Sequence, residues 1–459
     1  MSFVSVRTRR IKFWWHLTLA YFKRYQLRVL AGIAIAALLI FGSLKIFPAV
    51  YQGNTIKIGY IGTYNLETIP TEVLSLATQS LVTEGPDGKP IPSLASHWTV
   101  SGDGKTYVIF LKDNLAWHDS TPVDAKNISI AISNVQISAL NNKAIEFRLP
   151  NPISSFLQAL DKPVFKAKTF YGTGEFRIVG IDQVDSVIKR IRLHPKDPTL
   201  PKVEIKFYTS QQQAISALKM GDVKVLKVAN AKAFQSWPNV NVKQETDESS
   251  LVTIFYKTDD EFLSSRDLRQ ALSYAINKDN FDGEMATSPI SSASWAYNPQ
   301  VKRYDYSTAK AKELLSRTGQ KEKTITVSVM PGLTEVAQQI KENWEAIGIK
   351  VNIKDEKTIP TNFQALLAIN HLSPDPDQYS LWHSTQKKTN ITNYVNVKID
   401  KLLEDARSTK DEGQRKDSYF DFQKFLVEDE PATFLYHPYT YQVIYKNVQP
   451  LYNKLPISK

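Results

Sequence analysis

The sequence predicts an α/β fold preceded by one N-terminal transmembrane helix, and three observations lead to this prediction. A β-α-β unit is visible in the second half: an apolar strand at Ile325–Val329, a helix from Thr334 to Gly348, and a strand at Ile349–Ile353. Such a unit implies a parallel strand pair with a right-handed crossover. Capped helical patterns alternate with further strand patterns after residue 54, and sixteen uncharged residues, Val29–Leu44, precede them all.

The N-terminal segment predicts a basic cytoplasmic arm at 1–28 and a membrane anchor at 29–50. A bilayer core of ~30 Å needs about 20 helical residues, and the apolar run reaches that length if Lys45 extends its ammonium to the interface. Basic residues without any acid precede the run, and such a flank stays cytoplasmic. The rest of the chain is therefore expected outside the cell membrane. A cleaved signal peptide is the alternative, although no small-x-small cleavage site follows the run.

The formal charge of +11 belongs mainly to this N-terminal segment. Eight Lys and Arg and no acid lie in residues 1–52, so the remaining chain carries only +3. A nucleic-acid partner is therefore not expected. The chain has no Cys, which excludes disulfides, thiolate metal sites and Cys nucleophiles.

The first half of the outer part reads as short strands with few helices. Strands are predicted at Ile56–Tyr60, Thr106–Leu111, Val187–Leu193, Val203–Phe207 and Leu251–Tyr256, and a helix near Glu72–Leu81. Gly85 to Gly88 is a strong turn signal. A second helix is expected from Thr121, which can cap it, and Pro122, which suits its first position. Its apolar face would be Ile128, Ala131, Ile132 and Val135.

The second half is richer in helices that carry start and stop signals. Helices are predicted from Ser210 to Met220 before Gly221, from Ser265, from Ser307 to Gly319, from Thr334 to Gly348, and from Asp411. Trp344 lies on an apolar stripe and is expected in the core. Arg269 and Arg415 are expected to pair with nearby acids on helix surfaces.

Short motifs stand in a defined order along residues 54–450. They read LASHW and SGDGKTY at 94–107, LAWHD and PVDA at 115–125, YGTGEF at 171–176, RDLRQAL to AINK at 266–278, and Tyr306 to Leu315 with Gly319. In this order they resemble the family 5 extracellular solute-binding proteins, the oligopeptide- and dipeptide-binding components of ABC importers. The resemblance implies a two-lobed, type II periplasmic-binding-protein-like fold with a hinge. The N-lobe would hold 54–250 with the tail 433–459, and the C-lobe 251–432.

The resemblance also implies where a ligand would bind. Tyr64 and Asn65 follow the first strand, at the edge where open α/β sheets bind ligands, although an ordinary turn is the alternative. Trp295 and Tyr297 can present aromatic faces to a ligand or simply pack. The segment from His371 to Ser384 matches a cleft-lining stretch of the family. Its candidate ligand-binding residues are Asp375, Asp377, Tyr379, Trp382 and His383.

One departure from the family pattern concerns Leu372. Peptide-binding members carry at this position, near the proline of the stretch, an aspartate that pairs with the α-ammonium of the peptide. Either Asp375 takes this role, or the ligand has no free amine held there. Extended peptides can also be held through their backbone.

Metal and catalytic sites are not expected. The seven His form no H-x-x-x-H pair, and Asp375-Pro376-Asp377 lacks the Gly and Glu of a calcium loop. No G-x-S-x-G occurs. We therefore expect no metal, no cofactor and no enzyme activity, and a hydrolase is the least favoured alternative.

The expected function is that of a membrane-anchored, extracytoplasmic solute-binding protein of an ABC importer. Its ligand would be an oligopeptide or another small solute, and its partners would be the permease subunits and the membrane. The alternative from a different class is a sensory or interaction protein on the same fold, because one fold hosts many functions.

Overall fold

The computed structural model describes residues 14, 15, 24, 54–85, 88–319, 323–409 and 411–458. The chain divides into two compact units, residues 1–55 and 56–459. The predicted anchor at 29–50 lies outside the described residues, and only residues 14, 15 and 24 of the predicted arm at 1–28 are described. In the described parts of the chain, no helix is long and apolar enough to cross a membrane.

The second unit contains a 12-stranded mixed sheet that is shared between two sets of core residues. One core cluster draws its buried members from 251–436, whereas the other three draw theirs from 56–240 and 443–455. We call these two parts the C-lobe and the N-lobe. The fold is thus mixed α/β, as predicted, while the lobe boundaries at 250 and 432 remain a prediction.

The N-lobe part of the large sheet is mainly antiparallel, with β1 and β13 as a parallel pair. Its strands are β1 (Thr55–Ile61), β10 (Phe176–Val184), β11 (Val187–Pro195), β12 (Lys202–Tyr208), β13 (Val225–Val228) and β14 (Val240–Thr246). Its helices are α3 (Thr71–Ala77), α4 (Gln211–Lys219) and α11 (Gln449–Tyr452). Ser210 caps α4 and Gly221 follows it at φ +75°, as the sequence predicts.

A smaller set of strands in the N-lobe has a core of its own around Trp117 and Phe147. It consists of β2 (Val82–Glu84), β3 (Pro90–Pro92), β4 (Ala95–Val100), β5 (Thr106–Leu111), β6 (Ile128–Ser129), β7 (Gln136–Asn141), β8 (Ala144–Arg148) and β9 (Phe165–Lys166). β2 and β3 pair antiparallel, and Gly88 N donates to Gly85 O at 2.9 Å, at the two ends of the segment for which the sequence predicts a turn.

The helix predicted from Thr121 is wrong. Asp124 instead caps a single 3-10 turn, Ala125–Asn127, and the chain continues extended into β6. Ile128, Ile130 and Ile132 alternate with small residues and pack on the core of the small strands. This period of two is the strand pattern, and β-branched Ile favours it.

The predicted helix 72–81 is shorter than expected because its C-terminal end meets other backbone. It ends at Ala77, and Thr78 is extended and donates its hydroxyl to Val164 O. A Cβ on Gly174 would lie 2.6 Å from the carbonyl carbon of Ala77, so the Gly-Thr-Gly turn has no room for a side chain here.

The C-lobe contains the predicted β-α-β unit. β17 (Lys323–Val329) and β18 (Ile349–Asp355) are parallel, and α7 (Thr334–Glu345) connects them. The other strands are β15 (Ser250–Tyr256), β16 (Gly283–Met285) and β19 (Ala365–His371). The other helices are α5 (Arg266–Tyr274), α6 (Thr308–Arg317), α8 (Tyr379–Trp382), α9 (Val397–Ser408) and α10 (Glu412–Asp429). Ser265, Ser307 and Asp411 cap α5, α6 and α10 as predicted.

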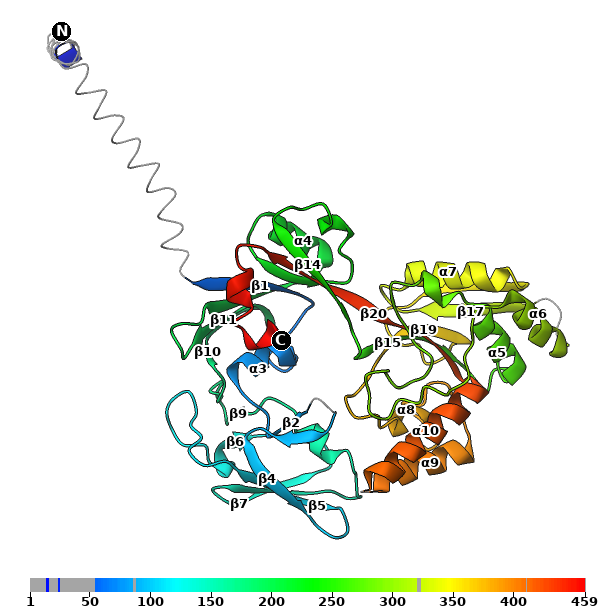
Figure 1. The fold of residues 1–459 in the computed structure, drawn as a ribbon, viewed down its shortest axis with the longest axis horizontal. Coiled ribbons are helices and arrows are strands. Elements are labelled where there is room, and N and C mark those ends of the chain that lie inside the picture. Colours follow the sequence, from blue (N-terminus) through cyan, green and yellow to red (C-terminus); the bar gives the residue numbers. More distant parts are fainter. Residues whose placement is uncertain are drawn as a thin grey trace, which may run out of the picture. The chain divides into compact units, whose positions relative to one another are not determined.

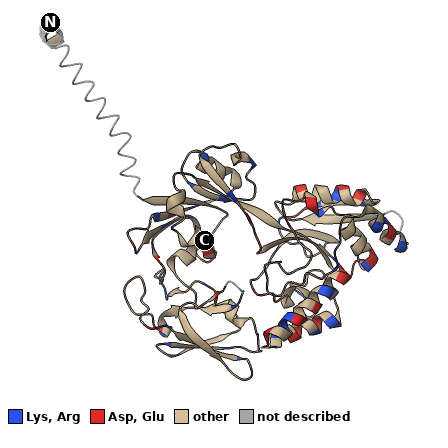
Figure 2. Cartoon of the chain, in the orientation of Figure 1, with Lys and Arg blue, Asp and Glu red and all other residues tan. Residues whose placement is uncertain are grey.

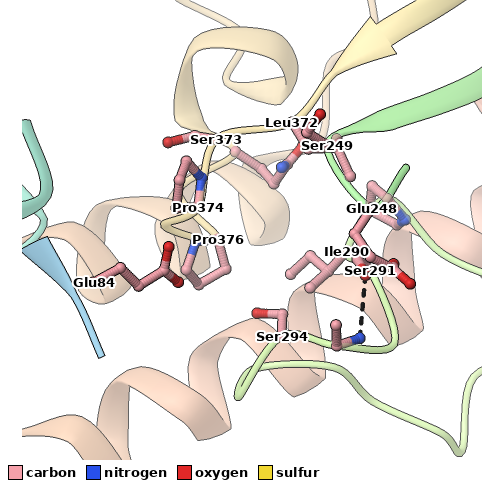
Figure 3. A pocket seen from close by; sticks show the side chains of 13 residues that line it. Glu84, Glu248, Ser249, Ile290, Ser291, Ser294, Leu372, Ser373, Pro374 and Pro376 are labelled. Atoms are coloured by element: carbon pink, nitrogen blue, oxygen red, sulfur yellow. Dashed lines mark hydrogen bonds between the residues drawn. The ribbon is translucent and has the colours of Figure 1, made fainter. Parts of the chain in front are cut away.

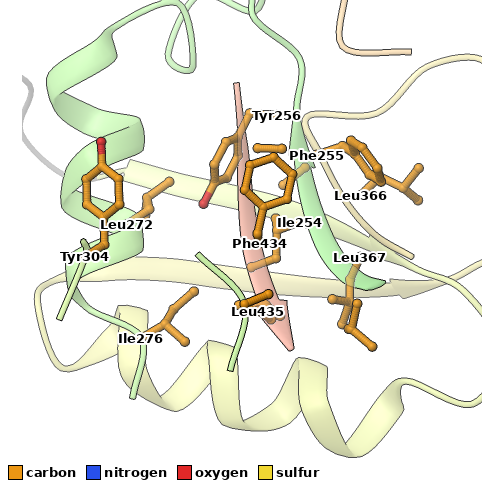
Figure 4. Close-up of a cluster of buried hydrophobic side chains, with 14 of the residues drawn as sticks. Ile254, Phe255, Tyr256, Leu272, Ile276, Tyr304, Leu366, Leu367, Phe434 and Leu435 are labelled. Carbon is orange, nitrogen blue, oxygen red and sulfur yellow. The ribbon is translucent and has the colours of Figure 1, made fainter. Parts of the chain in front are cut away.

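The C-lobe core lies where the sheet meets α5 and α7. Figure 4 shows Ile254 and Tyr256 of β15 beside Phe434 of the last strand. Fully burying such a side chain contributes about 1.5–3 kcal/mol. Trp344 is fully buried, as predicted, and its Nε1 donates to Leu272 O at 3.0 Å.

Strand β20 (Ala432–Tyr445) belongs to both lobes (Figure 1, red). Its first half pairs with β15 and β16, and its second half with β13 and β14. The segment Asp247–Ser249, between β14 and β15, is the second place where the chain crosses from one lobe to the other, and we call it the crossing segment. It lies beside β20, because Asp247 N donates to Pro438 O at 2.9 Å. Both crossings are short, so few residues separate the two lobes there.

Charged side chains of both signs gather on the outer helices of the C-lobe (Figure 2). This mixture is typical of a solvated surface and agrees with the low net charge of the outer part.

Candidate functional site

A cavity of about 240 Å³ lies where the two lobes meet. The N-lobe contributes Glu84 at the end of β2, and the crossing segment contributes Glu248 and Ser249. The C-lobe contributes the loop 289–294 and the segment 372–378. Its wall is therefore built from both lobes and from the connection between them (Figure 3).

The crossing segment is held against the C-lobe loop by polar contacts. Ser291 donates its hydroxyl to Glu248, and Ala293 N donates to Ser291 Oγ at 3.1 Å. Leu372 N donates to Ser249 O at 2.7 Å. The three stretches that form this side of the cavity are thus bound to one another.

The segment 372–378 is anchored by two arginines from helices α9 and α10. Arg415 donates from Nη2 to Asp375 Oδ1 at 2.6 Å, and Arg407 donates from Nε to Asp377 Oδ2 at 2.8 Å. The side chain of Asp375 is only 3% exposed. Burial raises the pKa of the Asp375 carboxyl, and the positive charge of Arg415 opposes that rise. A buried charge without its partner is costly, so these two ion pairs hold the segment 372–378 in place.

The prediction that Arg269 and Arg415 lie on helix surfaces is wrong. Both side chains are buried. Arg415 also donates to Ala406 O at 3.1 Å, and Arg269 donates to the carbonyl oxygens of Leu263 and Glu430 at 2.7 and 2.9 Å. A helical pattern shows which residues share a face but not whether another segment covers that face.

Aromatic rings lie against Arg407 and Arg415, the two arginines that bind the segment 372–378. The Arg415 guanidinium is 5.4 Å from the ring centroids of Trp295 and Tyr419. Arg407 lies 4.2 Å from the ring of Tyr379. Such cation–π contacts add to the ion pairs. Trp295 and Tyr379 thus pack against the arginines that hold the segment 372–378 in place.

The other predicted site residues of the C-lobe make contacts within that lobe. Tyr297 lies with its hydroxyl 3.1 Å from Thr287 Oγ1. Trp382 is fully buried in the C-lobe core. His383 is buried, stacks on Tyr379 with ring centroids 4.1 Å apart, and lies 3.2 Å from Glu404 Oε1.

Tyr64 and Asn65 lie elsewhere, in the N-lobe. Tyr64 packs on Phe207 with ring centroids 5.1 Å apart and donates to Ile61 O at 3.0 Å. Asn65 Oδ1 accepts from the backbone N–H groups of Glu67 and Thr68, at 2.9 and 3.0 Å. This is the geometry of a polar turn.

None of the nine predicted site residues lines the cavity, so a direct ligand role for them remains a prediction. Residues next to them in the sequence do line it. Ser294 directly precedes Trp295, and the residues that line the cavity around Asp375, Asp377 and Tyr379 include Leu372, Pro374, Pro376 and Gln378. Sequence reasoning missed Glu84 and Glu248. The only available signal was position, because Glu84 ends a strand before a strong turn and Glu248 precedes the strand that starts the C-lobe.

The lobes touch a second time, at the lower edge of Figure 1. Ser154 of the N-lobe donates from N and Oγ to the carbonyl oxygens of Arg407 and Ala406 at the end of α9, at 2.9 and 3.1 Å. Lys89 in the β2–β3 hairpin pairs with Glu412 at 2.9 Å. The cavity therefore lies between lobes that are in contact both at the crossing and at these residues.

Two larger hollows lie within single lobes. One of about 370 Å³ lies over β1 and β13 of the N-lobe, and one of about 380 Å³ lies beside β17 and β18 of the C-lobe. Among the residues that the structure describes, no group of three or more His, Asp or Glu could hold a metal ion.

A family model and several known proteins match this chain. The family model of the bacterial extracellular solute-binding proteins, family 5, matches residues 89–135 and 127–392. The chain is 28% identical over 333 residues to the oligopeptide-binding protein AppA of Bacillus subtilis, a match that covers 63% of this chain and 61% of that protein. It is 24% identical over 425 residues to the probable D,D-dipeptide-binding periplasmic protein DdpA of Escherichia coli, covering 79% and 80%.

A solved structure shares the fold. NikZ from Campylobacter jejuni, in complex with Ni(L-His), superposes with a TM-score of 0.70 and 21% identity, over 86% of this chain and 94% of that one. At this identity the likeness shows the fold alone. The family model, however, matches more than half of the chain with the motifs in order. This protein therefore belongs to family 5 of the bacterial extracellular solute-binding proteins.

Proposed function

We propose that this protein binds a peptide or a similar small solute in the cavity between its lobes and delivers it to the membrane subunits of an ABC importer. The observation that supports this proposal most is the composition of the cavity wall, which comes from both lobes and from the crossing segment between them. A ligand that contacts all three would shift the population toward the form in which the lobes touch.

The names of the relatives support the ligand class. One is named for oligopeptides and one for D,D-dipeptides, while the similar structure holds Ni(L-His). These ligands are small, polar and amino-acid based. The cavity of about 240 Å³ suits a short ligand of this kind, because sites that take drug-sized molecules are usually larger, roughly 300–1,000 Å³.

The proposal places the binding unit outside the cell membrane. Residues 29–50 would anchor it, with the basic arm 1–28 in the cytoplasm. The N-lobe, 54–250 with 433–459, and the C-lobe, 251–432, would close about β20 and residues 247–249. Tethering would keep the receptor at a high effective concentration near the permease. Alkaline carbonate extraction of membranes tests the anchor: the chain should stay in the pellet, and release into the supernatant would contradict it.

The ligand proposal is tested with the purified full chain in mild detergent. Native mass spectrometry should detect a co-purified solute, and a peptide library should contain members that raise the melting temperature. A ligand at 100 times its Kd stabilises by about 2.7 kcal/mol. The matched variants are Ser294→Trp, which fills the cavity, and Ser316→Trp, which changes an exposed serine on α6.

Stabilisation by peptides should vanish in Ser294→Trp and persist in Ser316→Trp. Equal stabilisation of both variants would place the ligand outside this cavity. If no solute is found and no peptide stabilises the protein, the alternative of a sensory or interaction protein takes precedence.

A further inference from the structure

The charged residues that line the cavity between the lobes are all negative. Glu84 and Glu248 are the charged residues of its wall, and no described Lys, Arg or His lines it. Figure 3 shows the two carboxylates on opposite sides of the cavity, with Pro376 and Ile290 between them. Apolar side chains thus lie between the two carboxylates, and serines and Gln378 complete the wall.

Both carboxylates have free acceptor capacity. Glu248 accepts one hydrogen bond, from Ser291, on Oε2. Within the described ranges, no side chain donates to its Oε1 or to either carboxylate oxygen of Glu84. An ionised carboxylate has about four lone-pair sites, so each of these groups can accept further hydrogen bonds from a ligand.

More negative charge lies next to Glu84. Its backbone N–H donates to Asp161 Oδ2 at 3.2 Å, and the Asp375 side chain of the C-lobe is close enough to act on it. Burial raises the pKa of Glu84, and the charges of Asp161 and Asp375 raise it further. Glu84 and Asp161 thus place like charges together at this end of the cavity, which costs free energy unless a positive charge compensates them.

Three cations of the neighbouring segments are already engaged. Arg415 pairs with Asp375, Arg407 with Asp377, and Lys89 with Glu412. Asp375 is buried and its Oδ1 accepts from Arg415, so it is poorly placed to take the ammonium role considered from the sequence. A positively charged ligand would compensate the charges of Glu84 and Glu248.

We propose that the cavity selects a positively charged ligand with an apolar body, and that Glu84 and Glu248 are the residues that determine this selectivity. A primary ammonium group of the ligand would donate charge-assisted hydrogen bonds to one of these carboxylates, and the charge of the other would add to the attraction. A ligand anion would meet no cation in the wall. This inference rests on the proposed function, because it takes the cavity between the lobes to be the ligand site.

The test measures binding to the full chain by calorimetry with matched probes. The probes are the dipeptide Leu-Ala, its C-terminal amide, its N-acetyl form, and 1,4-diaminobutane. The amide, which keeps the ammonium and lacks the carboxylate, should bind most tightly. N-acetylation should weaken binding at least tenfold, which corresponds to about 1.4 kcal/mol.

The variants Glu84→Gln and Glu248→Gln should each weaken binding of the amide at least fivefold and leave N-acetyl binding unchanged. Glu313→Gln is the matched control, because Glu313 pairs with Arg317 on the exposed face of α6. It should bind all probes as the wild type does.

The outcomes separate this inference from the proposed function. If the N-acetyl form binds as tightly as the amide, or if both Gln variants bind like the control, charge selection is refuted and the peptide-binding proposal stands. If only 1,4-diaminobutane binds, and does so through Glu84 and Glu248, the charge inference stands and the peptide proposal fails. Binding of none of the probes refutes both.

Discussion

The ion pair between Arg415 and Asp375 provides the sharpest test of how the cavity wall is held. Replacing Arg415 with Met keeps most of the apolar stem and removes the charge. The Asp375 side chain, 3% exposed, would lose its 2.6 Å partner, and the carbonyl oxygen of Ala406 would lose a donor at 3.1 Å. Removing one partner of a buried pair costs about 3–5 kcal/mol. Arg415→Met should therefore lower the free energy of unfolding by that amount.

Urea titration of the full chain, followed by tryptophan fluorescence, measures this loss. The double variant Arg415→Met with Asp375→Asn should recover part of it, because no uncompensated charge remains buried. Arg317→Met is the control: its partner Glu313 and Arg317 itself are 60% and 58% exposed, so the loss should be far smaller. A loss below about 1 kcal/mol in Arg415→Met, or strictly additive effects in the double variant, would refute the reasoning.

Three further predictions concern other parts of the fold. Trp344→Ala should lower the free energy of unfolding by about 3–5 kcal/mol, because the ring is fully buried; a urea titration that shows a loss below about 1 kcal/mol would contradict this. Gly174→Ala should lower the thermal midpoint, because the new Cβ would lie 2.6 Å from the Ala77 carbonyl carbon; calorimetry should detect the change, and an unchanged midpoint would show that the turn can relax. Burial raises the pKa of Glu430 from 4.5 to about 7, so the folded state holds this proton more tightly than the unfolded chain, and the stability contributed by the group falls as pH rises from about 4.5 through about 7. Glu430→Gln should flatten that part of the stability–pH profile, and an identical profile would argue against this assignment.

Local signals predict much of the fold correctly. Ser265, Ser307 and Asp411 each cap a helix as expected, because capping needs only neighbouring residues. The β-α-β unit follows from a strand, helix and strand with short connections. The helix predicted from Thr121 is wrong because the apolar residues from Ile128 onward alternate with a period of two, which is a strand pattern.

The candidate site is harder to predict because it depends on distant segments. The sequence identifies the stretch 371–384 through its resemblance to the family, but which side of that stretch faces the cavity depends on Arg407 and Arg415 behind it. Glu84 and Glu248 are far apart in the chain, and only the folded lobes bring them to one cavity. No spacing rule relates two such positions.

The shared strand β20 has a consequence for the order in which the protein can form. It is the last strand of the chain, and β14 and β16 pair with it and with no other described strand. A nascent chain on the ribosome that has not reached residue 432 thus lacks the strand that completes the large sheet in both lobes. Neither lobe can finish folding before residues 432–445 are made, and contacts between such distant residues form slowly. Truncation before residue 432 should therefore disable both lobes.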